Sequence, residues 1–468
     1  MEKSTFKTLT FLELALNLYL CSSKLLAMIY KFDPRYTIAQ FFVSIALRLN
    51  FRKMVFVGKK ENFSPKRPVI LAPNHRNALL DALLFVYSGY WSKQVVFLAR
   101  ADIFKKKFIA WILRGMRILP VYRVRDGKDN LDKNTEIFEN CGRILKRNNP
   151  IALFPEAAHN AKQALLPIKK AVPRIALPTE AQFDFALNSQ IVPVAIYYND
   201  MHDFLSDVYV RYGKPIEVSK YKDEYAENPT AATNHLRDEL ENELKKIVVN
   251  IWNDEFYDDY QFIIDTNAKR IAKEKFAQHK DAFALAARYI VLQLDHLFEH
   301  KKDDFDTFIA KVREARSILT ANKLSSKDSF QQPTSKGSLF ACFVALVLSA
   351  PVAIFGLLNG IFPILINRKL CGMFKDKQFV PSVRYVIGLF FVPLFTLLQS
   401  FLLGLFTNCT IAIGYLIAVP ITFYVGLWWR KWYYRTKRGW IVNRFAKNQA
   451  EVYQKVKELV YFDGAQSV

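Results

Sequence analysis

The sequence is poor in cysteine and places none in a pattern that would hold a metal. Its five cysteines form an odd set without a CxxC pair, and two of them lie inside apolar stretches: Cys21, Cys141, Cys342, Cys371 and Cys409. This pattern argues against a disulfide framework and against the usual zinc motifs. We therefore expect reduced thiols, as in the cytoplasm, and neither a metal nor a resident cofactor.

Acidic residues are also scarce relative to basic ones. Asp and Glu total 43 against 66 Lys and Arg, which gives a net charge of +23. Such an excess favours an anionic partner: nucleic acid, an acidic lipid surface or a phosphorylated substrate. No helix-turn-helix, zinc or RNA-stacking signature is present, and the 39 Phe fall mainly in long apolar runs. We therefore expect membrane lipids and phosphorylated substrates as partners, and no nucleic acid.

The N-terminal stretch lacks the layout of a secretory signal peptide, because Glu13 and Lys24 interrupt its apolar residues. Its apolar positions fall near helical spacing, and a second apolar stretch, Phe41 to Phe51, leads into a basic cluster. Amphipathic helices of this kind suit the interface between lipid and water. Residues 1–52 are therefore predicted to form interfacial helices, with ordinary core-packing helices as the alternative.

The next part of the chain, residues 53–217, alternates short apolar runs with helical stretches. The apolar runs have the length of buried strands and cover Met54 to Val57, Val69 to Ala72, Val95 to Ala99, Ile151 to Phe154, Ile191 to Tyr198 and Val208 to Tyr212. Alternation of this kind predicts an α/β domain with a mostly parallel sheet flanked by helices.

Residues 218–323 are helical and charged, and we call them the helical appendage. One apolar stripe runs through Leu236, Leu240, Leu244, Ile247, Val248 and Ile251, and a further helix is predicted from Lys273 to Phe298. No motif lies in this part, so we expect a packing or partner-facing role. Residues 324–338, rich in Ser, Lys, Gln and Pro, are predicted to be a linker.

Two uncharged tracts then follow in the membrane region, residues 339–429. Each tract, 339–366 and 385–429, is longer than the roughly 20 apolar residues of a spanning helix. The second is predicted to be a two-span hairpin that turns near Thr407, Asn408 and Thr410. The first, with two prolines and two glycines, fits one span or a re-entrant hairpin. Basic residues follow both tracts, so we expect the rest of the chain on the cytoplasmic face, with residues 430–468 as a basic tail helix.

The most informative string is Asn74-His75-Arg76-Asn77-Ala78-Leu79-Leu80-Asp81, directly after an apolar strand. Six helical positions correspond to a rotation of about 600°, so His75 and Asp81 could not share one helix face. His75 is therefore expected on the loop, with Asn77 as the N-cap of a helix that carries Asp81. The carboxylate would then orient the imidazole, whose other nitrogen is free to act as a general base.

The sequence resembles the membrane glycerolipid acyltransferase family, the PlsC-type phosphate acyltransferases, in four blocks between about Ala72 and Val194. The blocks are the string around His75, then Gly115 to Arg123, then Phe154-Pro155-Glu156-Ala157-Ala158-His159-Asn160, and last Ile191-Val192-Pro193-Val194. The segment Leu166 to Lys170 also resembles the family. The resemblance covers about a third of the chain.

The resemblance implies roles for individual residues. His75 is expected to be the catalytic base and Asp81 its orienting partner. The residues implied in substrate binding are Asn74, Arg117, Arg123, Glu156, His159, Lys169 and Lys170. Among these, Arg117 and Arg123 are expected to bind the substrate phosphate, and Glu156 to shape the acceptor pocket.

The sequence departs from the family pattern at two positions. Five residues separate His75 from Asp81 where the family usually has four, so the turn between them is expected to bulge. In the third block, Ala157, Ala158 and His159 follow Glu156 in place of a glycine and a phosphate-binding arginine. We expect His159, Lys169 or Lys170 to supply the missing positive charge.

By this resemblance the chain transfers an acyl group in phospholipid biosynthesis, from acyl-CoA or an acyl carrier protein to glycerol 3-phosphate. His75 would remove the acceptor proton, and no enzyme nucleophile is needed. Two alternatives stay open. One is transfer to 1-acylglycerol 3-phosphate (lysophosphatidate), and the other is a membrane-anchored lipid-binding protein whose acyltransferase site has decayed.

Overall fold

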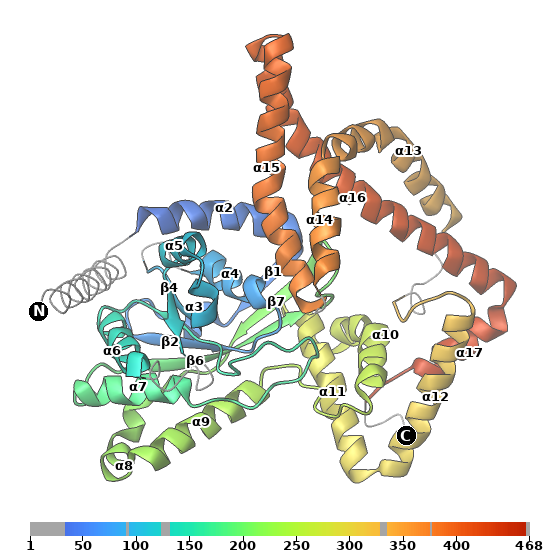
Figure 1. Cartoon of the computed structure of the whole chain (residues 1–468). Coiled ribbons are helices and arrows are strands. Elements are labelled where there is room, and N and C mark those ends of the chain that lie inside the picture. Colours follow the sequence, from blue (N-terminus) through green and yellow to red (C-terminus); the bar gives the residue numbers. More distant parts are fainter. Residues whose placement is uncertain (1–32, 90–92, 123–131, 328–334, 375–376, 465–468) are drawn as a thin grey trace, which may run out of the picture.

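The computed structural model describes residues 33–89, 93–122, 132–327, 335–374 and 377–464 (Figure 1). The predicted N-terminal helix before residue 33 and the site candidate Arg123 lie outside the described residues.

Within these residues one eight-stranded sheet forms the centre of the molecule. Its strands are β1 (Phe51–Val57), β2 (Val69–Pro73), β3 (Val96–Arg100), β4 (Ile118–Val121), β5 (Ile151–Ala152), β6 (Gln190–Tyr198), β7 (Ser206–Tyr212) and β8 (Ile216–Glu217). The order is β1-β7-β6-β2-β5-β3-β4, with β8 paired to β6. All pairs are parallel except β6 with β7 and β6 with β8. The predicted α/β class is therefore confirmed.

The strands are nearly continuous apolar runs because helices cover both faces of the sheet. The helices around the sheet are α2 (Pro34–Asn50), α3 (Lys59–Asn62), α4 (Ala78–Ser88), α5 (Lys107–Gly115), α6 (Asp132–Lys146), α7 (Ala171–Gln182), α8 (Lys222–Glu227) and α9 (Pro229–Lys245), with 3₁₀ turns at Ala101–Phe104 and Val218–Tyr221. Side chains alternate between the faces. Val69 and Leu71 of β2 pack under α2 and α4, whereas Ile70 and Ala72 pack against α6, α7 and α9. Figure 1 shows α2 on one side of the sheet and α6, α7 and α9 on the other.

The predicted boundary of the helical appendage needs correction. The stripe Leu236, Leu240 and Leu244 of α9 joins the core of the sheet, so α9 belongs to the α/β domain. The appendage proper comprises α10 (Tyr257–Lys275), α11 (Ala282–His300) and α12 (Lys302–Ala321). The helix predicted from Lys273 to Phe298 is wrong at its start, because α10 ends at Lys275 and α11 begins at Ala282.

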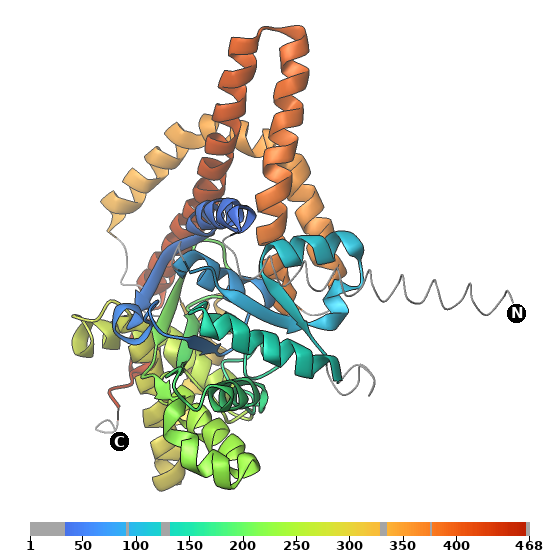
Figure 2. The same cartoon turned by 90° about the vertical axis from the view of Figure 1, so that its left-hand side faces the viewer.

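The C-terminal part consists of long apolar helices. They are α13 (Lys336–Asn359), α14 (Ile361–Met373), α15 (Val380–Phe406) and α16 (Cys409–Asn448), with a 3₁₀ turn η5 (Lys377–Phe379) before α15. Three of them, α13, α15 and α16, are long and apolar enough to cross a membrane. Figures 1 and 2 show the hairpin of α15 and α16 projecting away from the α/β domain.

Two features of this part shape its packing. The chain changes direction at Gly360, which ends α13 and precedes α14 (Figure 1). α16 continues without a break from the hairpin to Asn448, so the tail predicted to begin at residue 430 is not a separate helix. The following helix, α17 (Ala450–Val460), packs Val456 and Val460 into the core of the appendage. The C-terminal end is thereby anchored to α10, α11 and α12.

Candidate active site

The loop that carries His75 lies at the carboxyl edge of the parallel strands. β2 is fully buried between β5 and β6 and ends at Pro73, and α4 begins at Ala78 with Asn77 as its N-cap. Residues 74–77 therefore emerge from the middle of the sheet, where the open edge of an α/β fold usually binds its ligands.

His75 and Asp81 form a hydrogen-bonded pair. His75 Nδ1 lies 2.9 Å from Asp81 Oδ2, and the Asp81 side chain is completely buried while that of His75 is 14% exposed. Because Asp81 holds Nδ1, the imidazole offers Nε2 to a substrate, and no described residue forms a hydrogen bond with that atom. This geometry is what the predicted pairing of a general base with an orienting carboxylate requires.

The extra residue between His75 and Asp81 is absorbed by an extended N-cap. Asn77 has φ −130° and ψ 100°, and its side chain does not cap α4. Instead, the backbone N–H groups of Arg76 and Asn77 both donate to Asp81 Oδ2, at 2.7 and 2.6 Å. The loop thus wraps around the carboxylate, and the bulge brings the two side chains together.

The second oxygen of Asp81 accepts a hydrogen bond from Tyr198. The hydroxyl of Tyr198, the last residue of β6, lies 2.6 Å from Asp81 Oδ1. Both groups are buried, and burial together with the nearby carboxylate raises the pKa of Tyr198 well above its usual value. The phenol therefore remains a donor. Asp81 receives four hydrogen bonds in all, which compensates the burial of its charge.

Two residues predicted to bind the substrate, Asn74 and Glu156, form hydrogen bonds within and around the loop. The side chain of Asn74 exchanges two hydrogen bonds with the backbone of Ile196. Glu156 accepts from the backbone N–H of His75 at 2.7 Å and from that of Leu166 at 2.8 Å. Burial raises the pKa of Glu156 to about 7, although these two N–H groups pull it down. Both side chains hold the backbone of His75 in place.

Aromatic rings surround the imidazole. Phe154 stacks on His75 with ring centroids 3.9 Å apart, and His159 meets it edge-on at 5.8 Å. The backbone N–H of Asn160 donates to the carbonyl of His75 at 2.9 Å. The third sequence block thus closes over the first, and His159 lies beside the base.

The predicted cations differ in their position. Lys169 is exposed and donates its backbone N–H to Pro155, beside the Glu156 loop, and Lys170 follows at the start of α7. Arg117 precedes β4, at the amino end of a strand that runs in the same direction as β2, and donates to the carbonyl of Gln94. It is 3% exposed and lies at the opposite edge of the sheet from His75. The structure therefore does not bring Arg117 to the base.

Sequence reasoning missed three residues of this neighbourhood. Tyr198 ends an apolar strand and is typical of core aromatics. Arg76 is buried and donates to the carbonyl of Ala161. Ser382, at the start of α15, contacts Asn77. Only Arg76 had a signal in the sequence, because it stands inside the His75 string.

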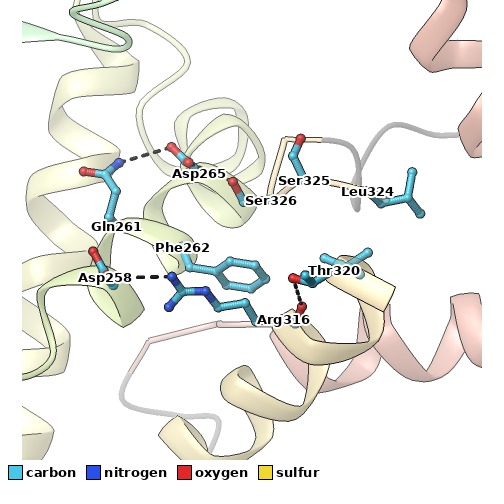
Figure 3. Close-up of a pocket in the computed structure, with 10 residues that line it drawn as sticks. Asp258, Gln261, Phe262, Asp265, Arg316, Thr320, Leu324, Ser325 and Ser326 are labelled. Atoms are coloured by element: carbon cyan, nitrogen blue, oxygen red, sulfur yellow. Dashed lines mark hydrogen bonds and ion pairs between the residues drawn. The ribbon is translucent and has the colours of Figure 1, made fainter. Parts of the chain in front are cut away.

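A separate pocket lies in the appendage between α10 and α12 (Figure 3). Arg316 pairs with Asp258 at 3.6 Å, and Gln261 bonds to Asp265 at 3.1 Å. Its lining contains neither histidine nor cysteine, so it provides no base of the kind at His75. Elsewhere in the described part of the chain, no cluster of three or more His, Cys, Asp or Glu side chains could hold a metal ion.

Comparison with known proteins finds the same domain. Residues 54–197 match the family model described as Acyltransferase. Glycerol-3-phosphate O-acyltransferase 2 of Saccharomyces cerevisiae is 26% identical over 52% of the chain and 33% of that protein. Glycerol-3-phosphate O-acyltransferase 1 of the same yeast is 32% identical over 22% of the chain and 14% of that protein. The chain thus matches a third or less of the length of these curated relatives.

Among solved structures, the crystal structure of the 1-acyl-sn-glycerophosphate (LPA) acyltransferase PlsC from Thermotoga maritima is similar. It is 19% identical, with a TM-score of 0.29, over 46% of this chain and 78% of that one.

Proposed function

We propose that the chain is a glycerolipid acyltransferase and that its acyltransferase domain acylates a hydroxyl of glycerol 3-phosphate. The donor is a fatty acyl thioester, acyl-CoA or an acyl carrier protein. The observation that carries the proposal is the 2.9 Å pair of His75 and Asp81, with Nε2 free at the carboxyl edge of the sheet.

In the proposed reaction His75 Nε2 removes the proton of the acceptor hydroxyl as its oxygen attacks the thioester carbonyl. The tetrahedral intermediate then expels the thiolate, which takes the proton from the imidazolium, so an ester and a free thiol result. Asp81 stabilises the imidazolium through Nδ1. General-base assistance of this kind contributes about 10² to 10⁴-fold to the rate.

The phosphate of the acceptor requires positive charge near His75. Lys169 and Lys170 follow a segment that is bound to the Glu156 loop, and His159 touches the imidazole ring. We therefore assign the phosphate to His159, Lys169 and Lys170, together with Arg123. Arg117 is left out of this set because it lies at the far edge of the sheet.

The membrane is proposed to hold the apolar surfaces of the chain. α2 buries one face and leaves a row of large apolar side chains exposed: Ile38, Phe41, Phe42, Ile45 and Leu49. We propose that this row lies in the lipid interface while α13, α15 and α16 enter the bilayer, with the catalytic domain on the cytoplasmic side.

The test is acyl transfer by purified protein in mixed micelles, with glycerol 3-phosphate and 1-acylglycerol 3-phosphate compared as acceptors. His75→Ala should lower the rate by at least about 100-fold, because it removes the general base. His300→Ala is the matched control, since this histidine is exposed at the end of α11. Full activity of His75→Ala would refute the mechanism.

The two acceptors decide between the alternatives. A faster reaction with 1-acylglycerol 3-phosphate would replace the proposed acceptor and keep the mechanism. Binding of lipid without turnover of either acceptor, by the unmodified protein, would instead support a lipid-binding protein with a decayed site.

A further inference from the structure

The first turn of α15 contacts the catalytic loop, 305 residues away in the sequence. Ser382 Oγ lies 2.6 Å from Asn77 Oδ1 and 3.1 Å from the backbone nitrogen of Leu79. The hydroxyl therefore donates to Asn77 and accepts from Leu79. Ser382 is only 5% exposed, so water does not compete freely for these bonds.

This contact supplies a cap that α4 lacks. The first N–H groups of a helix have no partner within the helix, and the side chain of the N-cap residue usually accepts one of them. Asn77 makes no such bond. Its side chain binds Ser382 instead, and Ser382 accepts the N–H of Leu79. A residue of an apolar helix thus caps the helix that carries Asp81.

Asn77, which binds the capping Ser382 through its side chain, is also hydrogen-bonded to Asp81 of the proposed catalytic pair. The backbone N–H of Asn77 donates to Asp81 Oδ2, the same oxygen that holds His75 Nδ1. A shift of Asn77 would therefore move a donor on the carboxylate that orients the base. α15 is itself fixed here, because Tyr385 donates to the carbonyl of Val43 in α2 at 3.0 Å.

Aromatic rings extend from the imidazole of His75 toward the start of α15. His159, whose ring meets that of His75, is 4.8 Å from the ring of Phe379, the residue directly before α15. The ring centroid of Phe379 is in turn 6.1 Å from that of Phe374, which directly follows α14. The side chain of Phe374 is 42% exposed. Apolar side chains therefore lead from the base to the apolar helices.

We propose that Phe379 and Ser382 complete the active site. Ser382 is a positioning residue that holds the His75 loop through Asn77, and Phe379 contacts the acyl chain beside His159. A fatty acyl chain is apolar and reaches His75 along the side where these helices begin. The inference rests on the acyl transfer proposed above.

The first test substitutes Ser382 and measures acyl transfer in mixed micelles. Ser382→Ala should lower kcat by about five- to tenfold, the effect of losing roughly one hydrogen bond, with KM for donor and acceptor within twofold. Ser382→Thr keeps a hydroxyl and should retain more than half of kcat. The matched control is Ser400→Ala, because Ser400 lies in the same helix, is buried and, among the described residues, donates to the carbonyl of Ala412, far from the His75 loop in the sequence.

Wild-type kcat in Ser382→Ala overturns the proposed role of Ser382. An equal fall in Ser400→Ala also overturns it, because general loosening of α15 would then explain both. Thermal midpoints of all variants are measured alongside. If Ser382→Ala does not fold, Ser382→Thr decides, since loss of activity at an unchanged midpoint despite the hydroxyl would contradict the positioning role.

The second test concerns Phe379 and compares donors with long and short acyl chains. Phe379→Ala should raise KM severalfold for a long-chain donor and leave KM for a short-chain donor within twofold. Phe390→Ala, at an exposed phenylalanine within α15, should change neither. An unchanged KM, or an equal rise for both donors, overturns the contact. Absence of acyl transfer by the unmodified protein would refute the proposed function, and full activity of His75→Ala would refute its mechanism, whereas these results bear only on the added residues.

Discussion

Tyr198→Phe is the sharpest test of how the buried Asp81 is held. The substitution removes one hydroxyl and leaves the ring in the core between β6 and α4. It deletes the 2.6 Å bond to Asp81 Oδ1, while Oδ2 keeps its bonds to His75 and to two backbone N–H groups. The shape of the site is thus preserved, and one oxygen of a buried carboxylate loses its only side-chain donor among the described residues.

The expected loss of unfolding free energy depends on whether the acceptor of the hydrogen bond is charged. Hydrogen bonds to charged groups contribute about 1.5–3 kcal/mol, against about 0.5–1.5 kcal/mol for neutral pairs. Two tyrosines of β7 calibrate the measurement. Tyr212 shares a neutral bond of 3.0 Å with Ser88, and the hydroxyl of Tyr209 lies 3.4 Å from Asp207, which also binds Arg52.

The assay compares the three Tyr→Phe variants by their free energy of unfolding in mixed micelles. We expect the largest loss of unfolding free energy at Tyr198 and a smaller one at Tyr212. The smallest loss is expected at Tyr209, because its 3.4 Å bond is long and Asp207 is already bound by Arg52. Acyl transfer should fall about tenfold in Tyr198→Phe through kcat, because His75 is less firmly oriented, and stay within twofold in the others. A loss at Tyr198 no larger than at Tyr212 would refute the view that Asp81 is a charged acceptor.

Two further predictions concern pH and helix packing. Burial raises the pKa of Glu156 to about 7 from 4.5, so the folded protein binds this proton more tightly than the unfolded chain. The contribution of this proton to the free energy of unfolding is complete below pH 4.5 and falls by roughly 3 kcal/mol as the pH rises through 7. Glu156→Gln should therefore remove this part of the pH dependence of the free energy of unfolding. An unchanged pH dependence would contradict the prediction. In the membrane part, a Cβ on Gly356 would lie 2.1 Å from the backbone of Thr422, so Gly356→Ala should separate α13 from α16 and lower the thermal midpoint. A Cβ on Gly388 would meet nothing within 4 Å, so Gly388→Ala should leave the thermal midpoint unchanged. Equal midpoints of the two variants would refute the close packing of α13 against α16.

The strands of the sheet could be predicted where they are continuous apolar runs. β2 and β6 are buried on both faces, so their sequences carry no polar alternation and differ plainly from the helices between them. β4 was missed because it is four residues long and lies inside the block that resembles the acyltransferase family. The two residues of β8 leave no pattern at all.

Helical periodicity identified the apolar stripes but not the surfaces they bury. The stripe of α9 shows that one face of this helix is covered, and nothing in its spacing distinguishes the sheet from α10 as the cover. The tail was predicted only as a basic helix, and nothing in that prediction indicated that Val456 and Val460 of α17 pack against the appendage. Partner surfaces are set by tertiary packing, which local periodicity does not encode.

The residues of the candidate site also fall into two groups, those that could be placed from the sequence and those whose contacts depend on tertiary packing. His75 and Asp81 are six positions apart, so loop and helix geometry alone restricts how they meet. Tyr198 reaches Asp81 from 117 residues away, and Ser382 reaches Asn77 from 305 residues away. These contacts depend on the order of the strands and on the docking of α15. Neither side chain is unusual for its element.

This division has a physical consequence for how the catalytic pair is built. Local backbone N–H groups satisfy Asp81 Oδ2, and they form whenever the loop and α4 fold. The bond to Oδ1 and the cap at Leu79 require the sheet and α15 to be in place. The local bonds therefore bring His75 to its partner, and the distant ones restrict the pair to a single geometry. In the proposed acyltransferase, the loop of the base would thus be held by α15, one of the helices long and apolar enough to cross a membrane.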